Sequence, residues 1–448
     1  MFMTHSLTKQ NKGWLVLGAL FFVNLFVIFF FWWQGSSASF GGAAPKGSLL
    51  IAFGKLFGLL AEYAILIQLV LIGRVASVER IFGFDRMNIV HRWLGYSLTI
   101  FIVGHPLMLI LGFGALNHVG FLSQFMTFFT DYEHVRNAFI AFLIFLFIIF
   151  ISIAPIRRAL RYETWYFTHL LMYVAIGLVF GHQIELGDVS EGVALYYWLA
   201  LNFLIFGLLI AFRFLRPLYL FYKHRFTVEK VVVESDEVVS IYITGRRMEE
   251  FRFKSGQYAN FTFLRKGFWF THPFSFSAAP NGRGLRVSVK SLGDFTSKLG
   301  NLKAGAKVII DGPLGIFTLD QAVKQKFFLI AGGIGITPLR ALAETLGQEK
   351  KDAVLFYANS SAKDIPLQSE LASLPIRQYF PISEASTEVL PPLQRGRIDK
   401  EKIVRLVPDF KEREIYICGP KPMMDAVRGI LRELGVERRF IHFEKFSY

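Results

Sequence analysis

HRWLGYSLTIFIVGHPLMLILG, residues 91–112, is the stretch that decides the fold of this chain. As an α-helix this apolar run would rise about 33 Å, enough to cross the hydrocarbon core of a bilayer. Its two histidines, His91 and His105, are 14 residues apart, which places them about 21 Å apart along the axis and within about 40° of one face. Imidazoles are costly in lipid, so this pair predicts a function.

A second pair, His169 and His182, occupies another apolar run, residues 165–183. If both runs cross in the same direction, His91 is level with His169 and His105 with His182, an arrangement that predicts metal ligands for two stacked b-type haems. Thirteen residues leave the second pair about 140° apart on a regular helix, so tilt, a distortion near Gly177 and Gly181, or a different approach of the haem must compensate. Helix-to-helix hydrogen bonds or a proton relay are the alternative roles of such histidines.

Composition divides the chain into a membrane part and a water-soluble part. Of the 448 residues 53% are hydrophobic, with 49 phenylalanines, and the long apolar runs stop near residue 225. Six runs are long enough to span a bilayer. They are residues 14–33, 49–72, 91–112, 135–154, 165–183 and 194–213. The first run is longer than the core of a signal peptide, which favours a retained helix.

The net charge of +15 is explained by arginine clusters at the ends of the predicted spans, so nucleic-acid binding is not expected. Placing the clusters inside puts both termini and the soluble part in the cytoplasm, in a multi-pass protein of the cell membrane. The single cysteine, Cys418, excludes an intrachain disulfide and a cysteine-built metal site. Histidine is therefore the plausible haem ligand.

The soluble part changes character along its length. Alternating runs such as residues 227–233, 238–244 and 285–291 predict antiparallel strands of a small barrel over 226–322. Over 323–448, FFLIA (327–331) predicts a buried strand that leads through GGIGITP (332–338) into a helix, as in a nucleotide-binding α/β domain. The fold class is thus multidomain: a six-helix transmembrane bundle over 1–225, an antiparallel β-barrel and an α/β domain.

Glycine turns supply the second group of candidate residues. In GGIGITP, glycines let backbone amides approach a pyrophosphate, and the threonine and helix N-terminus add a hydroxyl and a favourable dipole. CGPKPMM (418–424) ends another predicted strand about 80 residues later. The two turns predict a dinucleotide site formed by Gly332, Gly333, Gly335, Thr337, Pro338, Gly419 and Pro420.

These motifs, with FKSGQY (253–258), HPFSFS (272–277) and GDFT (293–296), resemble the ferredoxin–NADP reductase superfamily. His272, where most soluble relatives have arginine, and the four-histidine membrane part narrow the resemblance to the membrane NADPH oxidase and ferric reductase family, over essentially the whole chain. The resemblance implies FAD, and NADPH or NADH, as cofactors. The residues it assigns to FAD binding are His272, Pro273, Phe274, Ser275, Ser277, Gly293 and Thr296.

The resemblance also implies catalytic positions. Cys418 would abut the nicotinamide and flavin, while Glu444 and the aromatic Phe446 would cover the flavin near the C-terminus, with Tyr448 as the alternative aromatic. A 2′-phosphate would meet YANSSAKD (357–364), where Ser360, Ser361 and Lys363 either bind it or form a plain polar loop. The choice between NADPH and NADH stays open.

The expected activity is that of a superoxide-generating NAD(P)H oxidase. Electrons would pass from cytoplasmic NAD(P)H through FAD and two haems to external dioxygen. A ferric chelate, or a separate extracytoplasmic redox protein, is the alternative acceptor; a transporter with histidine proton relays is the non-enzymatic alternative. The expected partners are the lipid membrane and a small-molecule acceptor, and an obligatory protein partner is not indicated.

Overall fold

The structure is a computed structural model that describes residues 9–362, 365–384 and 391–445. It divides into two compact units, Met1–Arg213 and Phe214–Tyr448. Each unit is described by itself.

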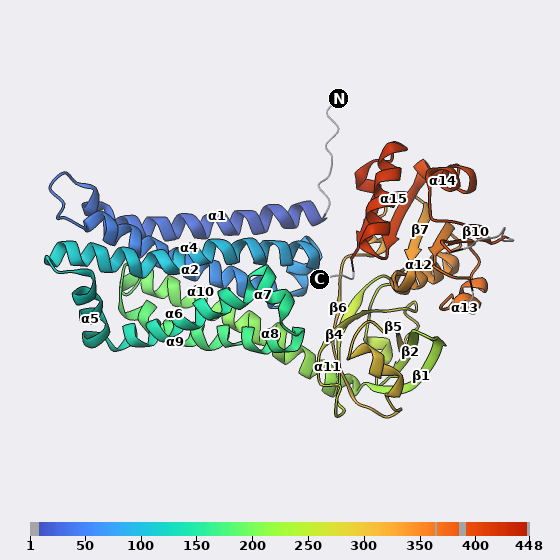
Figure 1. Ribbon diagram of the computed structural model, residues 1–448, viewed down its shortest axis with the longest axis horizontal. Coiled ribbons are helices and arrows are strands. Elements are labelled where there is room, and N and C mark those ends of the chain that lie inside the picture. Colours follow the sequence, from blue (N-terminus) through green and yellow to red (C-terminus); the bar gives the residue numbers. More distant parts are fainter. Residues whose placement is uncertain (1–8, 363–364, 385–390, 446–448) are drawn as a thin grey trace. The chain divides into compact units, whose positions relative to one another are not determined.

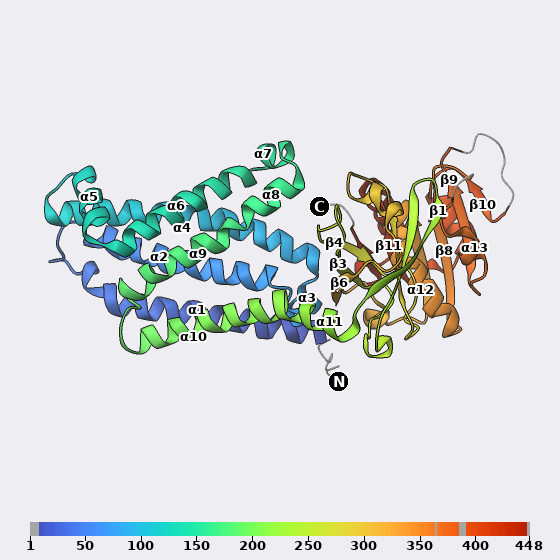
Figure 2. The same ribbon diagram turned by 90° about the horizontal axis from the view of Figure 1, so that it is seen from below.

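The first unit is a bundle of long helices, shown in Figure 1 and, from below, in Figure 2. Among the described residues, six helical segments are long and apolar enough to cross a membrane, as the sequence predicts. The long helices of these segments are α1 (Lys9–Ser36), α2 (Ser48–Ile72), α4 (Phe84–Asn117), α6 (Glu133–Ser152), α9 (Leu171–Glu185) and α10 (Gly192–Leu209). The short helices between them are α3 (Ala76–Phe82), α5 (Phe121–Asp131), α7 (Ala154–Ala159) and α8 (Tyr162–His169).

Helices α2 and α4 pack closely because small residues let their backbones approach. A Cβ added to Gly58 of α2 would lie 2.7 Å from Nδ1 of His105 on α4. One turn earlier, the carbonyl oxygen of Gly54 lies 2.8 Å from the same nitrogen. Nearer the other end of α4, Gly95 faces Gln68. The two helices are therefore antiparallel, and α2 passes both histidine levels of α4.

The span that carries the second histidine pair is broken. Helix α8 ends at His169 and α9 begins at Leu171. Leu170 N bonds to both Tyr166 O and Phe167 O, and Tyr173 N bonds to Leu170 O, so the turn is partly of the tighter i to i−3 kind. A turn of this kind changes the rotation of the helix. The irregular turn of this span lies at Leu170, whereas α9 continues through Gly177 and Gly181. A Cβ added to Gly177 would meet nothing within 4 Å, and Gly181 packs against His134.

The second unit begins with α11 (Arg216–His224) and a six-stranded barrel. Its strands are β1 (Thr227–Ser235), β2 (Val238–Thr244), β3 (Tyr258–Phe263), β4 (His272–Ser275), β5 (Leu285–Lys290) and β6 (Val308–Leu314). They form two antiparallel sheets, β1-β2-β5 and β4-β3-β6. Single bridges, Thr227 to Lys307 and Phe276 to Val287, join both pairs of sheet edges and close the barrel.

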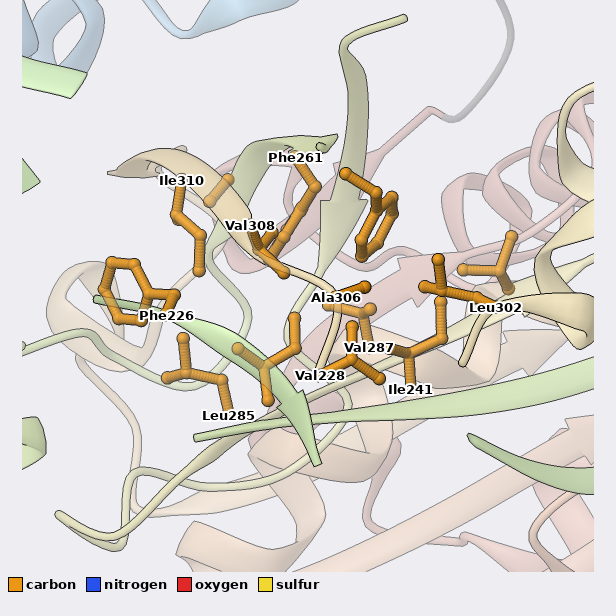
Figure 3. Close-up of a cluster of buried hydrophobic side chains, with 14 of the residues drawn as sticks. Phe226, Val228, Ile241, Phe261, Leu285, Val287, Leu302, Ala306, Val308 and Ile310 are labelled. Atoms are coloured by element: carbon orange, nitrogen blue, oxygen red, sulfur yellow. The ribbon is translucent and has the colours of Figure 1, made fainter. Parts of the chain in front are cut away.

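The barrel interior is filled by apolar side chains that alternate along the strands, as period-2 patterning requires. Figure 3 shows this core, whose labelled members are Phe226, Val228, Ile241, Phe261, Leu285, Val287, Leu302, Ala306, Val308 and Ile310. The core is packed with side chains, so a ligand of the barrel must lie on its outside or at its rim.

The rest of the unit is a six-stranded parallel sheet, ordered β10-β9-β8-β7-β11-β12. Its strands are β7 (Lys326–Gly332), β8 (Asp352–Ala358), β9 (Arg377–Ile382), β10 (Leu393–Arg395), β11 (Arg413–Cys418) and β12 (Ile441–Glu444). Helix α12 (Ile336–Gln348) packs against one face, and α14 (Lys400–Leu406) and α15 (Lys421–Glu433) against the other. The predicted barrel and α/β domain are both confirmed.

Candidate functional site

The structure brings the four membrane histidines together in the two predicted pairs. The ring centroids of His91 and His169 are 6.3 Å apart, and those of His105 and His182 are 5.9 Å apart. Imidazole nitrogens bind first-row metals at about 2.0–2.1 Å, so two rings on opposite sides of one metal have centroids roughly 6 Å apart. Both pairs fit one iron between their rings.

The other ring nitrogens differ between the pairs. Nδ1 of His105 is paired with the carbonyl of Gly54, an orientation that leaves Nε2 for a metal. For His91, His169 and His182, the buried Nδ1 atoms have no hydrogen-bond partner among the described residues. Only His105 thus has the outer-shell partner that metal-bound histidines usually have.

The predicted flavin strand, β4, is half exposed along one side of the barrel. His272 stacks on Phe295 at 3.9 Å between centroids, which ties the start of β4 to the GDFT turn. Pro273 and Phe274 are partly exposed, and Ser275 pairs with Tyr258 of β3. Within GDFT, the hydroxyl of Thr296 accepts from the backbone amides of Leu292 and Gly293, at 2.9 and 3.1 Å.

Ser277 lies apart from this surface. It is fully buried, its hydroxyl accepts from Arg286 and Ser288, and its carbonyl accepts from Arg286 and Arg340. Arg286 also binds Glu370 of α13 (Gln368–Ala372), with a closest N–O distance of 2.6 Å. Burial alone would raise the pKa of the Glu370 carboxyl, but hydrogen bonds and the positive charge of Arg286 and Arg340 outweigh it and lower that pKa.

This ionic network was missed by the sequence reasoning. Its members come from the barrel, α12 and α13, and they link the segment after the flavin strand to the helix after the glycine turn. The sequence contains no specific signal for it, because Arg286 takes one of the polar positions of the alternating strand LRVSVK (285–290), as Ser288 and Lys290 do. A buried charge predicts a partner but not its identity.

The two glycine turns are neighbours because the strands they follow, β7 and β11, are adjacent and parallel. A Cβ on Gly335 would lie 2.2 Å from the carbonyl oxygen of Cys418, so the turns touch backbone to backbone. Gly333 has φ +50° and nothing near its Cβ position, which leaves its backbone open to a ligand. The Thr337 hydroxyl donates to Ile334 O at 3.0 Å, and Pro338 is buried in the first turn of α12.

Residues of the motifs CGPKPMM and FKSGQY lie close to Glu444 on β12, the last strand of the sheet. Cys418 is the register partner of Glu444 on β12, and a Cβ on Gly315 would lie 3.8 Å from Glu444 Oε1 and 3.0 Å from the Tyr258 ring. Tyr258 was overlooked, although it closes the FKSGQY motif. Gly419 and Pro420 follow Cys418 into α15. Phe446, Tyr448 and Lys363 lie outside the described residues.

A family model matches each of the three parts of the chain: the membrane bundle, the barrel and the α/β domain. A ferric reductase like transmembrane component matches residues 57–180, an FAD-binding domain matches 223–318, and an oxidoreductase NAD-binding domain matches 329–429.

Individual relatives match half of the chain. Flavohemoprotein A of Dictyostelium discoideum is 30% identical over 244 residues, covering 50% of this chain and 60% of its own length. The glycine betaine monooxygenase reductase subunit of Chromohalobacter salexigens is 27% identical over 237 residues, with coverages of 50% and 64%. This chain thus spans less than two thirds of either relative.

Among solved structures, the FAD/NAD-binding domain of the nitric oxide dioxygenase from Vibrio cholerae is 27% identical, with a TM-score of 0.44. The match includes 100% of that domain and 50% of this chain. The three domain matches together, in this order along one chain, show that the protein has the architecture of the NADPH oxidase and ferric reductase family.

Proposed function

We propose that this protein is a transmembrane NAD(P)H oxidase that passes electrons from cytoplasmic NAD(P)H to external dioxygen and forms superoxide. The observation that carries the proposal is the pair of ring separations, 6.3 and 5.9 Å, at two levels of a bundle fused to a reductase. A single pair of histidines would support a haem protein. Two pairs at two depths support a path through the membrane.

In the membrane unit, His91 and His169 would hold the inner haem, and His105 and His182 the outer haem. A haem supplies one-electron carriage, and a flavin supplies the conversion of a two-electron hydride into single electrons. Because His105 and His182 would both bind the iron of the outer haem, an acceptor would receive the electron without binding that metal.

In the reductase unit, backbone amide groups would make most of the contacts with the nucleotide. The open amide region at Gly333 and the N-terminus of α12 would face a pyrophosphate. Half-exposed β4, with Pro273 and Phe274, would lie against the flavin ring. Cys418 and Glu444, side by side on β11 and β12, would border the place where nicotinamide and flavin meet.

The direction of transfer follows from the proposed topology. With the arginine-rich ends of the spans inside, the reductase is cytoplasmic. A membrane potential that is negative inside favours outward movement of each electron by about 2.3 kcal/mol per 100 mV. Outward transfer is then the downhill direction.

A ferric chelate is the second candidate acceptor, and the matched family description, ferric reductase like, favours it. Purified full-length protein, loaded with haem and FAD, separates the two. Cytochrome c reduction that is dependent on NAD(P)H and abolished by superoxide dismutase would support the oxidase. If the protein reduces a ferric chelate at the same rate with and without oxygen, the proposed oxidase is wrong and the protein is a ferric reductase.

Spectra of the same preparation test the ligands. The expected result is low-spin, bis-histidine haem at a stoichiometry of about two per chain. Absence of haem absorbance would overturn the proposed path and favour a transporter whose histidines relay protons.

A further inference from the structure

The membrane unit holds a buried carboxyl group that the proposed electron path does not use. Glu62 lies in the middle of α2 and is 3% exposed. Its Oε2 accepts a hydrogen bond from Nε2 of Gln183, at 2.8 Å, and its Oε1 has no partner among the described residues. A carboxyl group is expensive in lipid, and such groups mark ion or proton pathways.

Two further side chains, both on α10, extend the hydrogen bonds that start at this carboxyl group and Gln183. The indole Nε1 of Trp198, on α10, donates to Oε1 of Gln183 at 3.2 Å. Asn202, one turn later, donates to Trp198 O at 3.0 Å and is itself fully buried. Glu62, Gln183, Trp198 and Asn202 are called the Glu62 cluster below. It joins three helices through directed hydrogen bonds, which an accidental buried charge would not need.

The cluster lies nearer the outer histidine pair than the inner one. Gln183 directly follows His182 on α9, and Gly58, one turn before Glu62 on α2, packs against the ring of His105. Gln68, which is level with Gly95 and so near His91, is six residues further along α2, or about 9 Å. Side chains on a helix point toward its N-terminus, so the Glu62 carboxyl points toward the outer level.

Glu62 Oε1 is a buried oxygen that protonation would stabilise. Glu62 Oε1 and Asn202 Oδ1 are both buried acceptors without a donor among the described residues. A buried acceptor without a donor costs free energy that a proton on the carboxyl, or a bound water, would recover. The cluster therefore has an oxygen that gains from protonation.

We propose that Glu62 is a proton-binding site coupled to the outer histidine pair. When an electron arrives at that pair, one proton from water converts the Glu62 carboxylate to a carboxylic acid, and the hydroxide stays in bulk water. The charge inside the bundle is then unchanged. When the electron leaves, the proton returns. The inference rests on the proposed haem at His105 and His182.

The other titratable or charged groups around α2 do not fill this role. Tyr63, on α2, donates to Phe21 O, and Tyr197, on α10, donates to Asn24 Oδ1. Lys55 and Asp188 form an ion pair, at 2.7 Å, that is already neutral as a pair. On α4 and α9 the facing titratable groups are the two histidines of the outer pair and, at the end of α9, Glu185, which is half exposed and pairs with His134 of α6 at 2.8 Å. Glu62 is the buried carboxyl group of this set that has no ion-pair partner among the described residues.

The first test is a potentiometric titration of the haem-loaded full chain at several pH values. The wild-type outer midpoint should fall with rising pH, at up to about 59 mV per pH unit for one proton per electron. Glu62→Gln should remove this slope and leave the inner midpoint unchanged. The matched control is Glu191→Gln, an exposed glutamate at the start of α10, which should keep the slope.

The second test starts from the wild type, so its first measurement does not depend on folding of Glu62→Gln. A reduced-minus-oxidised infrared spectrum of the wild type should contain a carboxylic acid band that shifts in D₂O. The band should be missing in Glu62→Gln and present in Glu191→Gln. If the wild type binds two haems but shows neither the pH slope of the outer midpoint nor the carboxylic acid band, this inference is wrong and the proposed function stands. The same holds if the pH slope survives in Glu62→Gln. A wild type without haem overturns the proposed function as well.

Discussion

The membrane unit and the reductase unit build their sites from different parts of the chain. In the membrane unit, the proposed site consists of a few polar side chains, above all His91, His105, His169 and His182, on a background of apolar residues. In the reductase unit, the proposed site is formed mainly by the backbone of the turns at 332–338 and 418–420. Polar side chains are rare in a membrane span and are therefore easy to recognise in its sequence, whereas a site in the water-soluble unit depends more on glycine turns and on the order of the strands.

The greatest loss of activity is expected when a proposed haem ligand of the membrane unit is replaced. His105→Leu should remove the outer haem, lower the haem-to-protein ratio by half, and slow acceptor reduction by more than about 100-fold, beyond the 10–100-fold of outer-shell partners. Electron transfer from NAD(P)H to a soluble dye should persist. His118→Asn, at an exposed left-handed helix end, is the control and should keep both haems. Full haem content in His105→Leu would contradict the ligand assignment.

The next test asks whether packing, as well as ligand identity, sets the membrane site. Gly58→Ala places a Cβ 2.7 Å from the His105 ring and should weaken haem binding by about 10-fold, the scale of outer-shell changes. Gly177→Ala meets nothing and should bind haem normally. Haem titration of the apo protein measures both. Equal affinities would show that the α2–α4 contact does not orient His105.

The third test compares two glycines of one turn in the reductase unit. Gly335→Ala forces a Cβ onto the Cys418 carbonyl and should destabilise the unit by about 1–3 kcal/mol, the usual range for overpacking. Gly333→Ala has open space but a positive φ, and should cost about 1 kcal/mol while raising KM for NAD(P)H. Urea unfolding and steady-state kinetics separate the two effects. A greater loss of stability in Gly333→Ala would contradict the packing argument.

The last prediction concerns the dependence of stability on pH. Hydrogen bonding from buried Arg413 lowers the pKa of Asp409 to about 2, below its unfolded value of about 3.9. This contribution is complete above about pH 5 and is lost as pH falls through about 4 toward about 1. Asp409→Asn should reduce the free energy of unfolding by about 1.5 kcal/mol at pH 7 and flatten that acid loss. Asp236→Asn, exposed in a turn, should change neither; an unchanged acid profile in Asp409→Asn would exclude Arg413 as the cause.

Much of the fold was predictable because its patterns are strong. Apolar runs indicate six spans, alternation indicates barrel strands, and glycine turns after buried strands indicate the parallel sheet. The pairing of the histidines was also predictable, since charge at the span ends fixes direction. The ligand roles, the flavin and nucleotide residues and the domain boundary at 225 stay predictions.

The rest could not be read from the sequence for physical reasons. The break at Leu170 leaves no proline or glycine as a signal, because a tightened turn needs neither. Ser277, two residues beyond the end of β4, is fully buried against Arg286 and Ser288, a contact that the motif HPFSFS does not indicate, and its flavin role stays a prediction. Gln183 and Trp198, the partners of Glu62, likewise come together only through tertiary packing.

The helix break also sets how each side of the bundle tolerates change in length. His91 and His105 share one unbroken helix, α4, so one residue inserted between them would rotate His105 by about 100° and lift it by about 1.5 Å. His169 and His182 belong to α8 and α9, and the turn at Leu170 can absorb part of such a change. The spacing of the two levels is therefore set by α4, while the opposite side adjusts to it.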